Sequence, residues 1–259
     1  MNLLRIINIY VVLMGICIFF IIIGIRVLKR NREDRINQCF SAFFFTTAIG
    51  LIINFIYALI TNPEFQALVN FLNTFTIFLI CFGLAFLLLA VILLDPKKEV
   101  SSKSQLLIII LYGLVSSILF FIPDGVEVKI TSTGEQLSPV WSLPFVSVAL
   151  GILITSLILT SYYAINLYKR FNSSILRRKL KFFIMGISTF YYIGIMVCLS
   201  NYSGTHFLRL LFSISGIVTI PGGLLIYYGI YLAPKRPIKD LPVNESKKRK
   251  INLIGVEHS

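Results

Sequence analysis

Amide and hydroxyl side chains gather at one end of the most hydrophobic stretch of this chain. Asn70, Asn73 and Thr74 are spaced i, i+3 and i+4, so a helix would place all three on one face. Amide and hydroxyl groups donate and accept hydrogen bonds, but they do not titrate near neutral pH. This pattern indicates recognition of a neutral or weakly polar group, or hydrogen bonding between helices, and does not favour proton chemistry.

Further polar residues are expected at a similar depth in neighbouring apolar stretches. Asn54 and Tyr57 lie one turn apart, Tyr192 lies near the middle of a later stretch, and Arg209 lies at the start of the last one. Hydrogen bonds between membrane helices contribute about 0.6 kcal/mol each, and such packing is one interpretation. The other is a polar ligand pocket, in which Arg209 either holds an anionic group or extends to the membrane interface.

No set of residues with recognisable catalytic or metal-binding spacing is present. The four cysteines lie in or at the ends of apolar stretches without a CxxC pattern, and the chain has two histidines. We therefore expect no enzyme activity, no metal and no cofactor. All eleven acidic residues lie outside the apolar stretches or at their ends, which weighs against an ion-coupled pump.

The elements that carry these residues are expected to be membrane helices. The chain of 259 residues is 57% hydrophobic and has a mean hydropathy of +0.87, which is far too apolar for a soluble domain. Its net charge of +13 does not indicate nucleic-acid binding, because the basic residues lie in short loops between apolar stretches. The lipid bilayer is therefore the expected partner.

Seven apolar spans are predicted, which gives an all-α, polytopic bundle of seven transmembrane helices over residues 1–233. Residues 234–259 form a basic cytoplasmic tail that we expect to be disordered. The central span can hide its polar end against protein and show the rest to lipid. The predicted spans are residues 7–28, 37–60, 66–94, 105–122, 143–168, 182–200 and 206–233.

A small β-hairpin is predicted between helices four and five. Val126, Val128 and Ile130 alternate with charged residues, which is the period-two pattern of a strand. Residues 136–140 are expected to return as a second strand, and Trp141 then lies where an interfacial aromatic residue belongs.

The distribution of basic residues predicts the orientation of the chain. Lysine and arginine are frequent after the odd-numbered spans and in the tail, whereas the opposite side carries Arg5, Lys129 and Arg209. The positive-inside rule therefore places the amino terminus outside, the carboxy terminus in the cytoplasm of a cell-membrane protein, and the hairpin outside.

A hinge is predicted in the last span. Pro221 cannot donate a backbone hydrogen bond, and Gly222 and Gly223 follow it directly. This pattern indicates either a static kink or a point at which the inner half of the helix moves when something binds outside.

The chain resembles the seven-helix amino-terminal sensor region of membrane histidine kinases over about residues 7–240. The similarity lies in the basic, Asn-containing segment 32–40, the segment 139–144, the basic segment 177–181 leading to Gly186, and the segment 221–231. The resemblance implies a signal-input region, but only 26 residues follow Ala233, so the kinase itself is not part of this sequence.

These features lead to three hypotheses. The first is a stand-alone membrane sensor that passes an outer or membrane signal to a cytoplasmic signalling protein at the 169–181 loop or at the tail. The second is a transporter or lipid-handling protein for a neutral substrate, which usually requires internal repeats that this sequence lacks. The third is a scaffold that binds other membrane proteins.

Overall fold

The computed structural model describes residues 12–60, 62–95, 100–130, 137–205, 207–208, 211 and 215–231. The predicted tail, Arg209 and the beginning of the first predicted span lie outside the described residues.

The described residues form seven α-helices, two strands and two short 3-10 helices. Their bounds follow the predicted spans closely in the middle of the chain. The elements are α2 (Met14–Arg30), α3 (Arg35–Ala58), η2 (Pro63–Phe65), α4 (Gln66–Leu93), α5 (Ser102–Ser117), η3 (Ile118–Phe121), β1 (Val126–Ile130), β2 (Leu137–Trp141), α6 (Leu143–Arg170), α7 (Ser174–Ser203) and α9 (Thr219–Tyr231).

Five of these helical segments are long and apolar enough to cross a membrane. They are α3, α4, α5 together with η3, α6 and α7. Their outward faces carry large apolar side chains, such as Leu107 and Leu114 of α5, which are 65% and 64% exposed. A water-soluble protein would not show such a surface, so the chain is an all-α, multi-pass membrane protein whose helices contact lipid.

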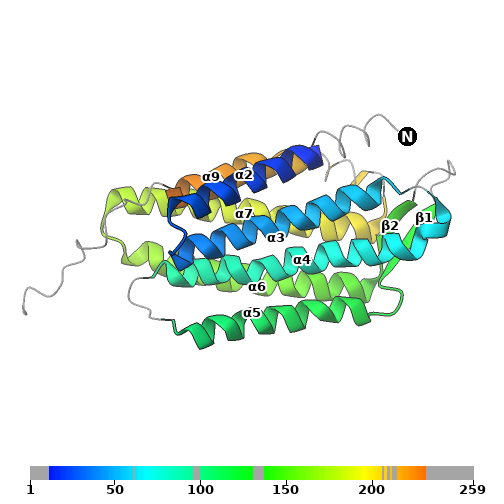
Figure 1. Cartoon of the computed structure of the whole chain (residues 1–259), viewed down its shortest axis with the longest axis horizontal. Helices are drawn as coiled ribbons and strands as arrows, with labels where there is room; N and C mark the ends of the chain where they lie inside the picture. Colours follow the sequence, from blue (N-terminus) through cyan, green and yellow to red (C-terminus); the bar gives the residue numbers. More distant parts are fainter. Residues whose placement is uncertain are drawn as a thin grey trace, which may run out of the picture.

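The helices run side by side along the long axis of the molecule (Figure 1). The strands β1 and β2 lie at one end of the bundle, which we call the sheet end. The connections from α2 to α3 and from α6 to α7 lie at the opposite end, which we call the basic end. The basic end carries Arg26, Lys29, Arg30, Arg32, Arg35, Lys169, Arg170, Arg177, Arg178, Lys179 and Lys181.

The most hydrophobic helix, α4, lies at the centre of the bundle and not at its lipid-facing surface. It packs against α3, α5, α6 and both strands. The half of α4 nearest the basic end is enclosed by protein, and its run from Leu87 to Ile92 is buried on every side. The expectation that this part of α4 faces lipid is therefore wrong, because a helix that is apolar all round also suits the core of a bundle.

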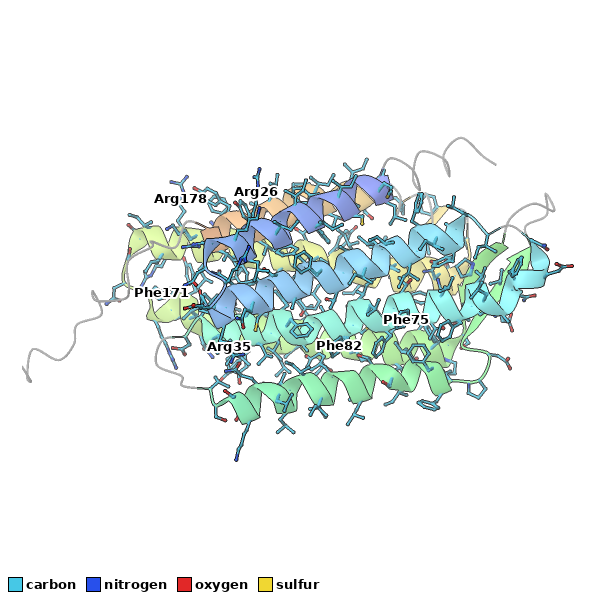
Figure 2. The ribbon with its side chains drawn as sticks, viewed as in Figure 1. Arg26, Arg35, Phe75, Phe82, Phe171 and Arg178 are labelled. Carbon is cyan, nitrogen blue, oxygen red and sulfur yellow. The ribbon has the colours of Figure 1, made fainter. Side chains whose placement is uncertain are left out.

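An aromatic seam joins α5 to α4. Phe75, Phe78 and Phe82 of α4 follow one another along the helix, with the rings of Phe78 and Phe82 stacked at 5.9 Å. Phe120 of η3 packs onto this row, 5.4 Å from Phe78. Figure 2 shows Phe75 and Phe82 in the space between the two helices.

The helix α7 begins earlier than the sequence predicted. It starts at Ser174, so the predicted basic loop over 169–181 is wrong, and only residues 171–173 connect α6 to α7. The basic residues of this segment are good helix formers, and they extend both helices beyond their apolar parts. A partner at this place would therefore meet two helix ends and not a long loop.

The last span is interrupted beside Pro221. Residues 217–218 form a turn, after which α9 begins. The carbonyl oxygen of Ile217 accepts a bond from the backbone nitrogen of Ile220 at 3.3 Å, because Pro221 has no N–H to donate. Pro221 thus lies in the first turn of α9, where a missing donor costs least.

The two glycines after Pro221 serve helix packing. A Cβ atom on Gly222 would lie 2.9 Å from Cγ2 of Thr189 in α7, and one on Gly223 would lie 2.7 Å from Cε1 of Phe19 in α2. Their lack of a side chain allows α9 to fit between these two helices. Whether the interruption also acts as a hinge stays a prediction.

Candidate functional site

A hydrogen-bonded junction at the sheet end joins α3, α4 and β2. The amide nitrogen Nδ2 of Asn73 donates to the hydroxyl of Tyr57 at 2.8 Å. Its amide oxygen Oδ1 accepts from Nε1 of Trp141 at 2.9 Å. All three side chains are buried, and Asn73 is only 1% exposed. Asn73 therefore acts as the centre of a buried network between two helices and the sheet.

The strands hold Trp141 in place for this bond. Trp141 ends β2 and pairs with Val126, the first residue of β1. Its ring meets that of Phe145 at 5.1 Å in an edge-to-face arrangement. Trp141 is 2% exposed, so its ring is enclosed by protein and does not face the lipid headgroups. Its indole N–H is satisfied inside the protein instead.

Two further contacts attach the sheet to the bundle. Nε2 of Gln66 donates to the carbonyl oxygen of Val128 at 3.3 Å. The side chain of Val128 packs with Tyr57 and Val69 in a small apolar cluster of its own. The sheet is thus bound to the start of α4 as well as to Asn73.

Asn70 and Thr74 lie beside the junction but differ from Asn73 in their bonding. The hydroxyl of Thr74 donates to the carbonyl oxygen of Asn70 at 3.0 Å, which is a bond within α4. Oδ1 of Asn70 is buried and has no hydrogen-bond partner among the described residues. An unsatisfied buried oxygen of this kind suits an added polar ligand, and Oγ of Ser142, next to Trp141, is another among the described residues.

Replacing Asn70 with leucine is expected to leave the unfolding free energy unchanged or to raise it by up to about 1 kcal/mol, because the change removes an unsatisfied buried polar atom. Thermal unfolding of the purified protein in detergent checks this result. A loss of stability as large as that of the Asn73 variant described below would show that Asn70 has a structural bond.

The remaining predicted site residues do not join the junction. Asn54 lies half-buried on α3, whereas Tyr192 lies on the outer face of α7 with 51% of its surface exposed. Tyr192 therefore faces away from the bundle, and it is Tyr191 that faces inward. Arg209 lies outside the described residues.

A second polar cluster lies deeper in the bundle. The hydroxyl of Tyr112 on α5 lies 2.8 Å from Oγ of Ser156 on α6. The hydroxyl of Tyr191 on α7 lies 3.1 Å from Oγ1 of Thr160, one turn along α6. All four residues are buried. The i, i+4 spacing of Ser156 and Thr160 on α6 was the available signal, but it indicates small-residue packing equally well.

The described residues contain no group of three or more histidine, cysteine, aspartate or glutamate side chains that could hold a metal ion. The four cysteines are free and buried, each within a helix. What the junction itself offers is hydrogen bonding by neutral side chains.

Comparison with protein-family models finds no match to this chain, and comparison with curated proteins finds no similar sequence. The interpretation of the junction therefore rests on its own geometry. That geometry is a pair of strands bonded through Asn73 to the central helix of a membrane bundle.

Proposed function

We propose that this protein is a stand-alone membrane sensor, with the sheet end outside the cell and the basic end in the cytoplasm. In this proposal α2 and α9, with the residues next to them, are the two spans beyond the five long apolar helices. The strands β1 and β2 form the predicted outer hairpin. Support comes from the concentration of arginine and lysine at the basic end, as the positive-inside rule requires of a cytoplasmic face.

The observation that carries this proposal is the bond between Trp141 of the sheet and Asn73 of α4. A ligand or membrane change that displaces the sheet must also disturb Asn73, and through it Tyr57 on α3. Because α4 is the central helix and runs to the basic end, a shift in α4 would affect its packing partners α3, α5 and α6 along their length.

In this proposal the disturbance passes from the sheet through α4 to the basic end, and we call this path the relay. The interruption before α9 allows the last helix to move in response. Since α9 is a short helix that packs against both α2 and α7, a small rotation about residues 217–218 would change the surface that the basic end presents. A cytoplasmic signalling protein that binds there would sense the change. The alternative, a transporter for a neutral substrate, would require the same polar groups to face the two sides in turn.

Cysteine labelling in intact cells tests the orientation on which the proposal depends. The native cysteines are buried, so introduced ones should dominate the labelling. Glu127→Cys, on β1, should react with a membrane-impermeant maleimide in intact cells. Ser173→Cys, between α6 and α7, should react only after permeabilisation. The reverse pattern would refute the orientation.

Liposomes separate a sensor from a transporter. The purified protein should not release entrapped neutral solutes such as glycerol or sucrose faster than empty liposomes do. Rapid release of one solute, abolished by Asn73→Leu but not by the exposed change Tyr202→Phe, would favour transport instead.

A further inference from the structure

The helices α7 and α9 meet unusually closely near the basic end. A Cβ atom on Gly186 of α7 would lie 2.6 Å from the carbonyl oxygen of Gly222 on α9. One on Gly229 of α9 would lie 2.6 Å from Cβ of Phe183 on α7. Since the helix backbones nearly touch, the larger side chains beside the contact are displaced to the outer surface of the pair.

Beside this contact, a cation lies over one ring of an aromatic pair. The ring of Phe182 on α7 meets that of Tyr228 on α9 at 5.3 Å, nearly at a right angle. The guanidinium carbon of Arg178 lies 5.9 Å from the centre of the Phe182 ring. This cation–π contact orients Arg178, and among the described residues no hydrogen bond or ion pair engages its N–H groups, so they suit an anion from outside. Figure 2 shows Arg178 projecting from the basic end.

Apolar side chains continue this surface toward the middle of the membrane. Met185 lies on the same face of α7 as Phe182, and Leu224 lies one turn before Tyr228 on α9. They are 48% and 49% exposed. Arg178 comes one helical turn before Phe182, so the surface changes from cationic to apolar over about 6 Å.

The surroundings of Arg178 add positive charge. Nη1 of Arg30 on α2 donates to the carbonyl oxygen of Ile230 at 2.8 Å, at the end of α9. Arg30 also lies within electrostatic range of Lys179. The carboxylate of Asp95, an acid at this end, is bound to Arg170 at 2.6 Å. Glu33 and Asp34 lie between α2 and α3 at the same end, where the basic residues outnumber these acids. The α7–α9 surface thus attracts anions.

We propose that the outer seam between α7 and α9 binds an anionic phospholipid. The phosphate binds Arg178, and the acyl chains lie along Phe182, Met185 and Leu224. The charge of Arg178 selects an anionic headgroup, and the exposed apolar side chains below it match acyl chains better than a water-soluble acidic protein. This proposal does not depend on the proposed sensor function.

Native mass spectrometry of the full-length protein tests this site. The protein is purified in detergent and offered equal amounts of a phosphatidylglycerol and a phosphatidylcholine with the same acyl chains. Wild-type protein should retain the phosphatidylglycerol preferentially. Arg178→Gln should lower that preference about fivefold, the effect expected for one basic residue near the membrane surface.

Arg177→Gln is the matched control. Arg177 is the neighbouring residue on the same helix and is exposed, but its Nε donates to the carbonyl oxygen of Phe171 at 2.5 Å. It should keep the wild-type preference. Phe182→Leu keeps an apolar side chain and the charge of Arg178 but removes the ring beneath it. It should weaken the preference in the same direction as Arg178→Gln but less, and it tests the site if the Arg178 variant fails to fold.

Three results would overturn the proposal. The first is equal loss in the Arg177 and Arg178 variants, which would mean a diffuse basic surface. The second is unchanged preference in both Arg178→Gln and Phe182→Leu. The third is no preference for phosphatidylglycerol in the wild-type protein. Arg178 would then bind a different partner, such as an acidic protein.

Discussion

Replacing Gly186 with alanine is expected to lower the unfolding free energy by about 2 kcal/mol, the usual cost of inserting a methyl group into a closely packed contact. The new Cβ would lie 2.6 Å from the carbonyl oxygen of Gly222 and 2.8 Å from the backbone nitrogen of Ile226. Both atoms belong to the backbone of α9, so no side chain can rotate away. The helix must move as a whole, and thermal unfolding in detergent measures the loss.

Gly151→Ala is the control for this change. Gly151 lies in the first third of α6, and a Cβ added there would meet nothing within 4 Å. The same substitution at this position should leave stability unchanged or raise it by up to about 1 kcal/mol, because alanine favours the helix more than glycine does. Equal stability of the Gly186 and Gly151 variants would contradict the close α7–α9 contact.

Replacing Asn73 with leucine is expected to have a similar cost of about 2 kcal/mol, because it leaves the buried indole N–H of Trp141 without its acceptor. Leucine keeps the branched shape of asparagine and is no smaller, so the loss does not come from a cavity. Chemical unfolding of the variant and wild-type proteins measures it. Wild-type stability in this variant would show that the junction contributes nothing to the fold.

The fluorescence of Trp141 offers an independent readout of the same change. Trp141 is the single tryptophan of the chain, so all tryptophan emission reports the junction. Asn73→Leu should shift the emission maximum, whereas the exposed change Tyr202→Phe should not. A shift without loss of stability would mean that the indole finds another partner.

The sequence predicted the bundle's central helix well, for an identifiable reason. Polar and charged residues flank α4, and its observed bounds, Gln66–Leu93, differ from the predicted ones by one residue. The start of α7 was missed by eight residues because arginine and lysine next to an apolar span suit a helix as well as a loop. Hydropathy marks where a span enters the membrane and not where its helix begins.

The contacts between distant segments were not predictable in the same way. Asn73 was recognised as a polar group on the face of α4, but its partner Trp141 lies 68 residues away on a strand. Tyr191 and Tyr192 are neighbours, and only the rotation of α7 decides that the first faces the bundle. Single-sequence patterns give no information about such rotations or about which strand residue meets which helix.

These contacts change the meaning of the predicted pocket. Asn73 is satisfied by two bonds and therefore has a structural role in the resting protein. Asn70, with its unpaired buried oxygen, is the better candidate for contact with a ligand. The two asparagines of one helical face thus separate into a structural group and a candidate recognition group, and their leucine variants distinguish the two roles.

The central claim is that a change at the sheet end is relayed to the basic end, and a distance measurement between spin labels tests it most directly. Labels on Lys29→Cys in α2 and Ile175→Cys in α7 report on the two helices that contact α9, while the native cysteines stay buried. Tyr57→Phe, which removes the hydroxyl bonded to Asn73, should shift or broaden the distance distribution in liposomes. The exposed change Tyr202→Phe should leave the distribution unchanged. A distribution for Tyr57→Phe that matches the wild-type distribution would contradict the relay.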